Sequence, residues 1–362
     1  MKGMLDRRRL SLALVALAMI LAPASYARAD ETDNFTCAAR LTRDSLAALD
    51  ALMNARIAGA IERANRRKAC DAACLIHELQ EYVGDSTPDR VTWIPHSKFL
   101  GSVRKDSGIE RCHLKFKDTI YGAKPVNQPW LLPFYGRIIF VADSILVAGH
   151  VVGLDKVDHF IREGLDHWKR VHEKGSEISA SVAVEVGRPG GALKWTEYGL
   201  KGASLTGVFA YADLAAGYYG YQFWSDLLSI DQPRAYVGSS GGGRYRQLRP
   251  FTFAPYVNAA WDERMNASTF EAKLEQDVGK VFRERSIDKP ARDCASLAGL
   301  PDARLYVNPI CLAIEPESPA RRTAAQAQRR PPAARSCCPY QPRTSACPSC
   351  RWTAVRPSQG TT

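Results

Sequence analysis

A short acidic stretch of the chain contains residues that could bind a metal ion or transfer protons. The segment DKVDHF, residues 155–160, brings together Asp155, Asp158 and His159, and Glu163 follows one turn later. Residues three and four apart lie on one side of a helix, so a helix would group these side chains. Carboxylates and imidazoles bind divalent metals and also form acid–base pairs. The stretch therefore predicts either a metal site or an acid–base centre.

The element that positions these residues is predicted to be a helix that begins at Asp155 and ends before Gly175. Asp155 is suited to cap its first turn, and Asp158 places negative charge at the positive end of the helix dipole. Apolar residues recur at helical spacing along one face. They are Val157, Phe160, Ile161, Gly164, Leu165, Trp168 and Val171. His159 lies on the opposite face, where it is either solvated or cap-paired, or belongs to a functional site that a second layer covers.

A second predicted helix carries a carboxylate on its packed side. In the segment YADLAAGYYGYQFW, residues 211–224, small residues four apart allow another backbone to approach closely. Asp213 lies in the middle of that face, where a carboxylate needs a cation, a metal or several donors as partner. We expect Lys156, His159 or Arg162 to supply it. Asp213 then either locks the two helices together or belongs to a functional centre.

The two motifs together resemble the signature of a known family. DKxxHF is followed about fifty residues later by DLxAxxxG, and this pair is similar to motifs of the VanZ-like envelope proteins and of related small predicted periplasmic lipoproteins. The matching positions are Asp155, Lys156, His159, Phe160, Asp213, Leu214, Ala216 and Gly220. The resemblance implies an envelope setting and a coupled Asp/His/Asp group, without naming a substrate.

The first 29 residues have the features of a secretory signal peptide. Arginines at 7–9 precede an apolar run at 10–22, and a small-x-small cleavage site ends at Ala29. We therefore expect cleavage before Asp30 and a periplasmic or secreted mature chain. The junction has no lipobox cysteine, which argues against a lipoprotein.

The formal net charge of +11 is concentrated at the two ends of the chain. The predicted signal carries +4 and residues 315–362 carry +6, which leaves about +1 for residues 30–314. A nearly neutral body argues against a nucleic-acid-binding surface. Residues 315–362 are rich in Pro, Ala, Arg, Ser and Cys and poor in large aliphatic residues. We expect this tail to be disordered.

Six cysteines of the predicted body form an even set, which suits an exported, disulfide-bonded protein. They are Cys37, Cys70, Cys74, Cys112, Cys294 and Cys311. Residues 42–67 and 71–84 predict an antiparallel pair of helices. We expect Cys294 to bond with Cys311. The other four should staple the N-terminal pair, with Cys70 and Cys74 bonded to Cys37 and Cys112.

Other segments are predicted to be short strands or loops. Residues 138–154 are rich in β-branched residues and predict a pair of short strands. They are too short and too polar to span a membrane. Residues 85–135 contain five prolines and are predicted to be irregular. Residues 231–250 predict a flexible basic loop, because the run GSSGGG precedes three arginines.

Two further carboxylates are interpreted from their neighbours. Glu197, beside aromatic residues, is a surface carboxylate or, in a dry setting, a general acid. Its pairing with Asp213 would suit glycan cleavage, in which two carboxylates flank the bond. Glu263 follows Asp262, and this acidic pair is expected to cap the next helix.

These patterns predict a mainly α protein, a helical domain with a minor β element and a disulfide-tied N-terminal helical pair. Its expected regions are a signal peptide (1–29), an N-terminal disulfide-stapled region (30–135), a main helical region (136–314) and a disordered tail (315–362).

Two classes of function stay open. The first is an exported envelope protein that acts as a metal-assisted hydrolase, with Asp155, Asp158, His159 and Asp213 as its polar centre. Asp158, His159 and Asp213 would bind an unspecified divalent metal. The second is a non-catalytic structural module, or one that binds anionic lipid or cell-wall material, in which these residues lock helices together. Partners would be an envelope component, a small-molecule substrate or a membrane surface, and not nucleic acid.

Overall fold

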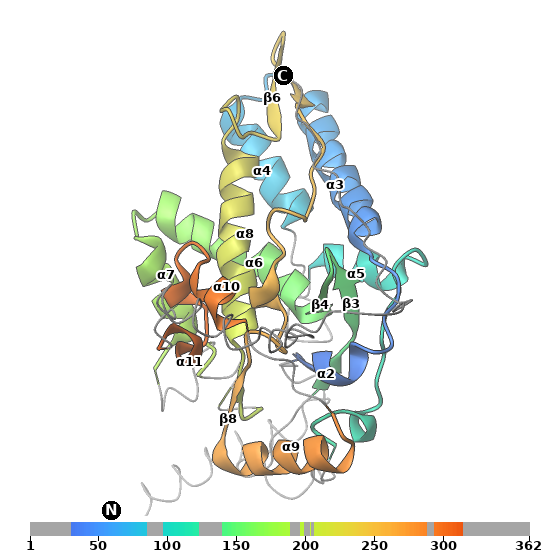
Figure 1. The fold of residues 1–362 in the computed structure, drawn as a ribbon. Coiled ribbons are helices and arrows are strands. Elements are labelled where there is room, and N and C mark those ends of the chain that lie inside the picture. Colours follow the sequence, from blue (N-terminus) through green and yellow to red (C-terminus); the bar gives the residue numbers. More distant parts are fainter. Residues whose placement is uncertain are drawn as a thin grey trace, which may run out of the picture. The chain divides into compact units, whose positions relative to one another are not determined.

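The chain folds mainly into helices, as its sequence predicts (Figure 1). The predicted signal peptide and C-terminal tail lie outside the described residues. A computed structural model describes residues 30–84, 97–122, 140–188, 196–198, 203, 206–287 and 293–313. All of them belong to one unit that ends at Ile314, where the composition of the chain changes.

The helices range from single turns to 21 residues. They are α2 (Asn34–Cys37), α3 (Leu46–Arg66), α4 (Ala72–Val83), α5 (Lys98–Lys105), α6 (Leu154–His172), α7 (Ile178–Val186), α8 (Tyr211–Leu228), α9 (Ala272–Glu284), α10 (Cys294–Ala298) and α11 (Pro309–Leu312). Short 3-10 turns are η1 (Phe116–Asp118), η2 (Ala259–Trp261) and η3 (Ala303–Leu305).

The strands are short and pair two by two in the part of the chain that the structure describes. They are β1 (Asp30–Thr32), β2 (Phe140–Ala142), β3 (Ser144–Val147), β4 (His150–Gly153), β5 (Val208–Phe209), β6 (Val237–Gly241), β7 (Arg244–Gln247) and β8 (Thr269–Phe270). β1 and β2 are parallel, whereas β3 with β4, β5 with β8 and β6 with β7 are antiparallel. The predicted strand pair within 138–154 is therefore present as β3–β4, which leads directly into α6.

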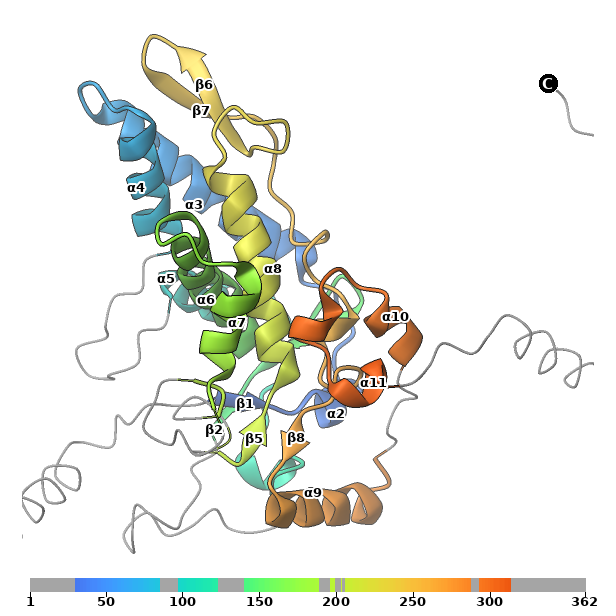
Figure 2. The ribbon, with the colours of Figure 1, turned by 90° about the vertical axis from the view of Figure 1, so that its left-hand side faces the viewer.

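Helices α6 and α8 lie side by side, as both ribbon views show (Figure 1, Figure 2). Their closest approach is at Gly164 and Gly220: a Cβ atom on Gly220 would lie 2.1 Å from the carbonyl oxygen of Phe160. The Trp224 indole N–H donates to the Ile161 carbonyl at 2.8 Å. The small-residue face of α8 is thus a packing face, because only glycine permits this backbone contact.

The apolar face of α6 packs into an aromatic core. The Phe160 ring lies 5.0–5.6 Å, between centroids, from the rings of Phe223, Phe253, Tyr256 and Trp261. Contacts of this kind add to the free energy gained from burying the apolar area. They fix the rotation of α6, and therefore the direction in which its polar face points.

Helices α3 and α4 form the predicted N-terminal pair, but its disulfides differ from the prediction. Cys37 is bonded to Cys112, and Cys70 is bonded to Cys74. Cys70 precedes the N-cap of α4 and Cys74 lies in its first turn, so their Cα atoms are only 5.3 Å apart. The predicted Cys294–Cys311 bond is confirmed. The three disulfides fit an oxidising compartment.

Two segments predicted as irregular contain regular structure. The Ser97 hydroxyl accepts a hydrogen bond from the Leu100 amide and caps α5, within the segment 85–135. The supposed basic loop is the β6–β7 hairpin, whose turn uses positive φ angles at three consecutive glycines, residues 241–243. Among the described residues, no helix combines the length and apolar character that a membrane crossing requires.

Candidate metal centre

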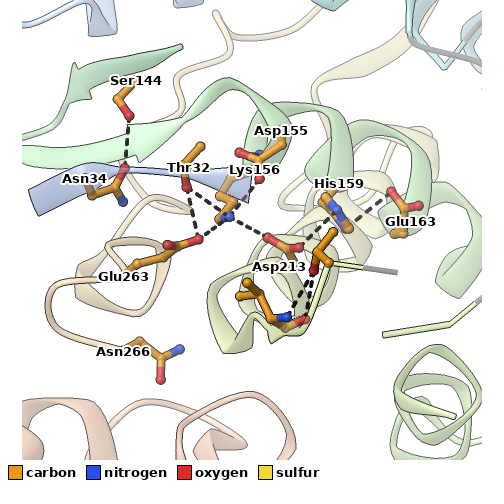
Figure 3. A network of polar contacts seen from close by, with 12 residues as sticks. Thr32, Asn34, Ser144, Asp155, Lys156, His159, Glu163, Asp213, Glu263 and Asn266 are labelled. Atoms are coloured by element: carbon orange, nitrogen blue, oxygen red, sulfur yellow. Dashed lines mark hydrogen bonds and ion pairs between the residues drawn. The ribbon is translucent and has the colours of Figure 1, made fainter. Parts of the chain in front are cut away.

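A buried lysine lies where α6 meets α8 (Figure 3). Because β4 leads directly into α6, Lys156 enters the first helical turn, and its side chain is fully buried. Its Nζ lies 2.8 Å from Asp155 Oδ2 and 2.7 Å from Asp213 Oδ1. Glu263 Oε1 lies at 2.5 Å, and Thr32 Oγ1 accepts a hydrogen bond at 3.3 Å. We call these five residues the lysine cluster.

Burial dominates the electrostatics of the lysine cluster. It raises the pKa of Asp155 to about 7, although the adjacent ammonium of Lys156 opposes this. Burial also raises the pKa of Glu263 and of its neighbour Glu31. Burial lowers the pKa of Lys156, but the surrounding carboxylates outweigh it and raise that pKa well above its usual value. The ammonium therefore stays charged, as a compensating cation must.

Asp213 joins the lysine cluster to His159. Its Oδ1 contacts Lys156, whereas its Oδ2 lies 3.4 Å from His159 Nε2. The other ring nitrogen, Nδ1, lies 3.6 Å from Glu185 Oε1 and 3.7 Å from Glu163 Oε2. These distances exceed the usual range of an N–H···O hydrogen bond, about 2.7–3.2 Å. The imidazole thus lies within 3.4–3.7 Å of three carboxylates, which come from α6, α7 and α8.

His159, Glu185 and Glu197 form a group that could hold a metal ion, and we call it the histidine cluster. One ligand atom from each residue lies within 4.8 Å of the others. Two ligands at about 2.0–2.4 Å from one ion can be at most about 4.0–4.8 Å apart, when they lie on opposite sides of it. One imidazole nitrogen with two carboxylate oxygens suits zinc or manganese. The spacing and chemistry of the three side chains therefore fit a divalent cation.

The fold brings this cluster together from three segments. His159 comes from α6 and Glu185 from the last turn of α7. After α7 the chain returns alongside it: the Glu197 amide donates to the Glu185 carbonyl at 2.9 Å, and the Tyr198 amide donates to the Val186 carbonyl at 3.0 Å. Both glutamates are buried. These two backbone hydrogen bonds thus hold Glu197 next to Glu185.

The predicted site residues lie in three environments. Asp155 and Asp213 belong to the lysine cluster, and His159 belongs to the histidine cluster. Asp158 joins neither: its Oδ1 accepts from the Ser97 amide at 2.8 Å and its Oδ2 pairs with Arg162 at 3.1 Å. The structure therefore does not bring the three predicted metal ligands together. The polar face of α6 is nevertheless covered, as a functional site there requires.

Two of the three expected partners of Asp213 contact it, namely Lys156 and His159. The third, Arg162, pairs with Asp158 instead. Glu263 was expected to cap a helix and instead contacts Lys156. Glu185 carried no local signal beyond a helical pattern. Only tertiary contacts show that these residues belong to the polar centre.

Comparisons of the chain with protein-family models, curated proteins and solved structures found no match. The resemblance to VanZ-like envelope proteins stays a prediction. What the protein does must therefore be inferred from its own geometry.

Proposed function

We propose that the protein is exported to the cell envelope and is a hydrolase that depends on a divalent metal bound by the histidine cluster. The observation that supports this proposal is the convergence of one imidazole nitrogen and two carboxylate oxygens from separate segments within 4.8 Å. Three protein ligands with an open position are typical of catalytic metal sites, whereas structural sites are usually closed by four. The predicted signal segment and the three disulfides favour export to the periplasm or beyond.

The residues around the site have complementary roles in this proposal. A divalent metal polarises a scissile carbonyl or phosphoryl group and lowers the pKa of a bound water. His159 presents Nδ1 toward Glu185, so Nδ1 is the nitrogen suited to bind the ion. Its Nε2 faces Asp213, which can accept the Nε2–H and fix the tautomer. Lys156 holds the other oxygen of Asp213 in place.

Metal content tests the proposal directly. We expect elemental analysis of the purified mature chain, loaded with Zn²⁺ or Mn²⁺ and desalted, to give about one ion per chain. Glu197→Gln and His159→Ala should lose most of it, whereas Asp158→Asn, a buried carboxylate outside the cluster, should retain it. Chelation should abolish hydrolysis of ester or phosphoester test substrates, and the metal should restore it. A wild-type chain that binds neither ion would overturn the proposal and favour a structural role for these residues.

A second candidate function concerns the β6–β7 hairpin. The hairpin is anchored to α3, because the Asn65 side chain donates to the Tyr245 carbonyl at 2.9 Å and accepts from the Tyr245 amide at 2.8 Å. Tyr245 is buried, and Arg244 and Arg246 on either side of it are exposed. Both arginines therefore project from a rigid strand near the end of α3.

Two glutamates at this end of the molecule pair with arginines, whereas Asp231 accepts hydrogen bonds from Ser239 and Asp71 caps α4. Glu62 pairs with Arg66, and Glu78 pairs with Arg63 and Arg67. Exposed basic residues of this end for which no ion pair is found among the described residues include Lys68, Arg234, Arg244, Arg246 and Arg249. Their uncompensated charge favours an anionic lipid surface as partner.

Vesicle binding tests this second function. We expect the protein to sediment with vesicles that contain phosphatidylglycerol, and to be released by salt. Arg244→Gln combined with Arg246→Gln should weaken binding, whereas Lys280→Gln, an exposed lysine on α9, should not. Equal binding to neutral vesicles would exclude the electrostatic mechanism.

A further inference from the structure

A buried polar chain lies behind Glu185. His167 of α6 is fully buried, and its Nε2 lies 2.6 Å from Glu185 Oε2. Its Nδ1 lies 2.7 Å from the hydroxyl oxygen of Ser181, which Arg170 also contacts at 3.5 Å. Ser181 and Glu185 are four residues apart on α7, so both face α6. The chain therefore runs from Arg170 through Ser181 and His167 to Glu185.

The donors in this chain have a definite direction. A carboxylate only accepts hydrogen bonds, so an ionised Glu185 requires the hydrogen on Nε2, and Nδ1 of the neutral ring then accepts from the Ser181 hydroxyl. Nε2 of the neutral imidazole then carries the hydrogen and donates it to Glu185. The contact with His167 holds Oε2 of Glu185. The other oxygen, Oε1, points toward His159.

Helix α8 packs against the side chains of His167 and Glu185. Gly217 lies against both: a Cβ atom at this position would lie 3.1 Å from Glu185 Oε2 and 3.3 Å from His167 Nε2. These separations are tighter than ordinary van der Waals contact. The absence of a side chain at Gly217 therefore lets the imidazole and the carboxylate fit between α6, α7 and α8.

The residue types are also those of a serine hydrolase triad, but the geometry argues against that role. In such triads the serine hydroxyl faces Nε2 of the histidine and the acid faces Nδ1. Here the two nitrogens have the opposite partners. Ser181 is also only 1% exposed, so a substrate could not reach its hydroxyl.

We propose that His167, oriented by Ser181, is a positioning residue that holds Glu185 in the conformation that binds the metal. This inference rests on the proposed function of the histidine cluster. Residues that hydrogen-bond metal ligands orient them, and their loss typically weakens metal affinity by about 10–100-fold. His167 would act on the metal only through Glu185, because it contacts Oε2 and the Oε1 oxygen faces His159.

The test measures the dissociation constant for Mn²⁺ by titration calorimetry and by electron paramagnetic resonance of the free ion, with the mature chain. We expect His167→Leu to weaken binding by about 10–100-fold, and His167→Gln, which keeps an N–H donor, to restore most of the affinity. His172→Leu is the matched control, since His172 is an exposed histidine of the same helix. It should bind Mn²⁺ like the wild type.

The outcomes separate the inference from the proposed function. A wild-type chain that binds no Mn²⁺ or Zn²⁺ would overturn both. Wild-type binding together with unchanged affinity in folded His167→Leu would overturn the positioning role alone. If His167→Leu does not fold, Ser181→Ala decides: we expect it to weaken binding by about threefold to tenfold, because His167 loses the partner of Nδ1. Wild-type affinity in that variant would contradict the inference.

Discussion

The lysine cluster and the histidine cluster are neighbours that share the environment of Asp213 but solve the problem of buried carboxylates differently. In the first, the Lys156 ammonium lies 2.5–2.8 Å from three carboxylate oxygens. In the second, His159 lies 3.6 Å from Glu185 of the same cluster and 3.4–3.7 Å from Asp213 and Glu163 beside it. The first therefore contains its cation within the chain, whereas the second is the group at which we propose that an added cation binds.

This difference teaches how one centre can combine stability with binding. Burying charged groups costs desolvation energy, and only close, well-oriented contacts between them offset that cost. The lysine cluster meets that condition and fixes the relative positions of β1, α6 and α8. It thereby orients Asp213, whose second oxygen faces His159. A rigid cluster beside a looser one is the arrangement expected when a scaffold holds a binding site in place.

Removal of the built-in cation should have the largest effect. Lys156→Met leaves the carboxylates of Asp155, Asp213 and Glu263 buried without their ammonium. We expect the free energy of unfolding in urea to fall by about 3–5 kcal/mol, the usual cost of breaking a buried ion pair. Lys280→Met, which removes an exposed pair with Glu284, should change it by less than about 1 kcal/mol. A similar small change for both variants would refute a structural role for the lysine cluster.

The stability of the lysine cluster should also depend on pH. Burial raises the pKa of Asp155 to about 7 in the folded chain, above its ordinary value of 3.8. The folded state thus holds this proton more tightly, so its contribution to stability is full below pH 4 and declines as pH rises to about 7. Between these limits we expect the free energy of unfolding to fall by about 3 kcal/mol more in the wild type than in Asp155→Asn.

Parallel pH profiles of the two proteins, measured by urea unfolding from pH 4 to pH 8, would contradict this. Glu31 and Glu263 contribute a decline of the same sign, since burial raises the pKa of both. They are present in both proteins, so the comparison isolates Asp155.

One substitution made in each cluster should separate their roles. Glu263→Gln replaces a carboxylate that contacts Lys156 at 2.5 Å, and Thr32 donates to the same oxygen at 3.0 Å. We expect the metal-free protein to lose about 2 kcal/mol of stability. Glu197→Gln instead removes one of two close carboxylates, and should leave stability unchanged or raise it by up to about 1 kcal/mol. Equal destabilisation by Glu263→Gln and Glu197→Gln would mean that both clusters stabilise the fold to the same extent.

The sequence predicted the two central helices and their pairing through small residues, because hydrophobic period and glycine spacing are local signals. It also predicted that Asp213 needs a cation, a metal or several donors as partner, and named Lys156, His159 and Arg162 as candidates. The bond between Cys70 and Cys74, which were expected to pair with Cys37 and Cys112, and the β6–β7 hairpin were not predicted. In each case a single turn decides the geometry, and helical periodicity does not report it.

The site could be predicted only in part from the sequence, for a physical reason. Asp213 could be found because it stands out from the packed face of its helix, and His159 because it shares one side of its helix with acidic residues. Glu185 and Glu197 become neighbours through backbone hydrogen bonds between α7 and the returning chain. Such contacts depend on where a loop leads after a helix, which the residue types alone do not specify.

Asp158 provides the finest distinction between the clusters, because the sequence placed it among the metal ligands and the structure pairs it elsewhere. Asp158→Asn weakens a charge-assisted bond from the Ser97 amide and the ion pair with Arg162. We expect the free energy of unfolding to fall by about 1 kcal/mol, since the Ser97 amide and the Arg162 guanidinium both keep a polar partner in the asparagine. Metal affinity should be unchanged, because Asp158 contacts the start of α5 rather than the histidine cluster. A dissociation constant for Mn²⁺ that rises tenfold in this variant would return Asp158 to the ligand set and make the two clusters one site.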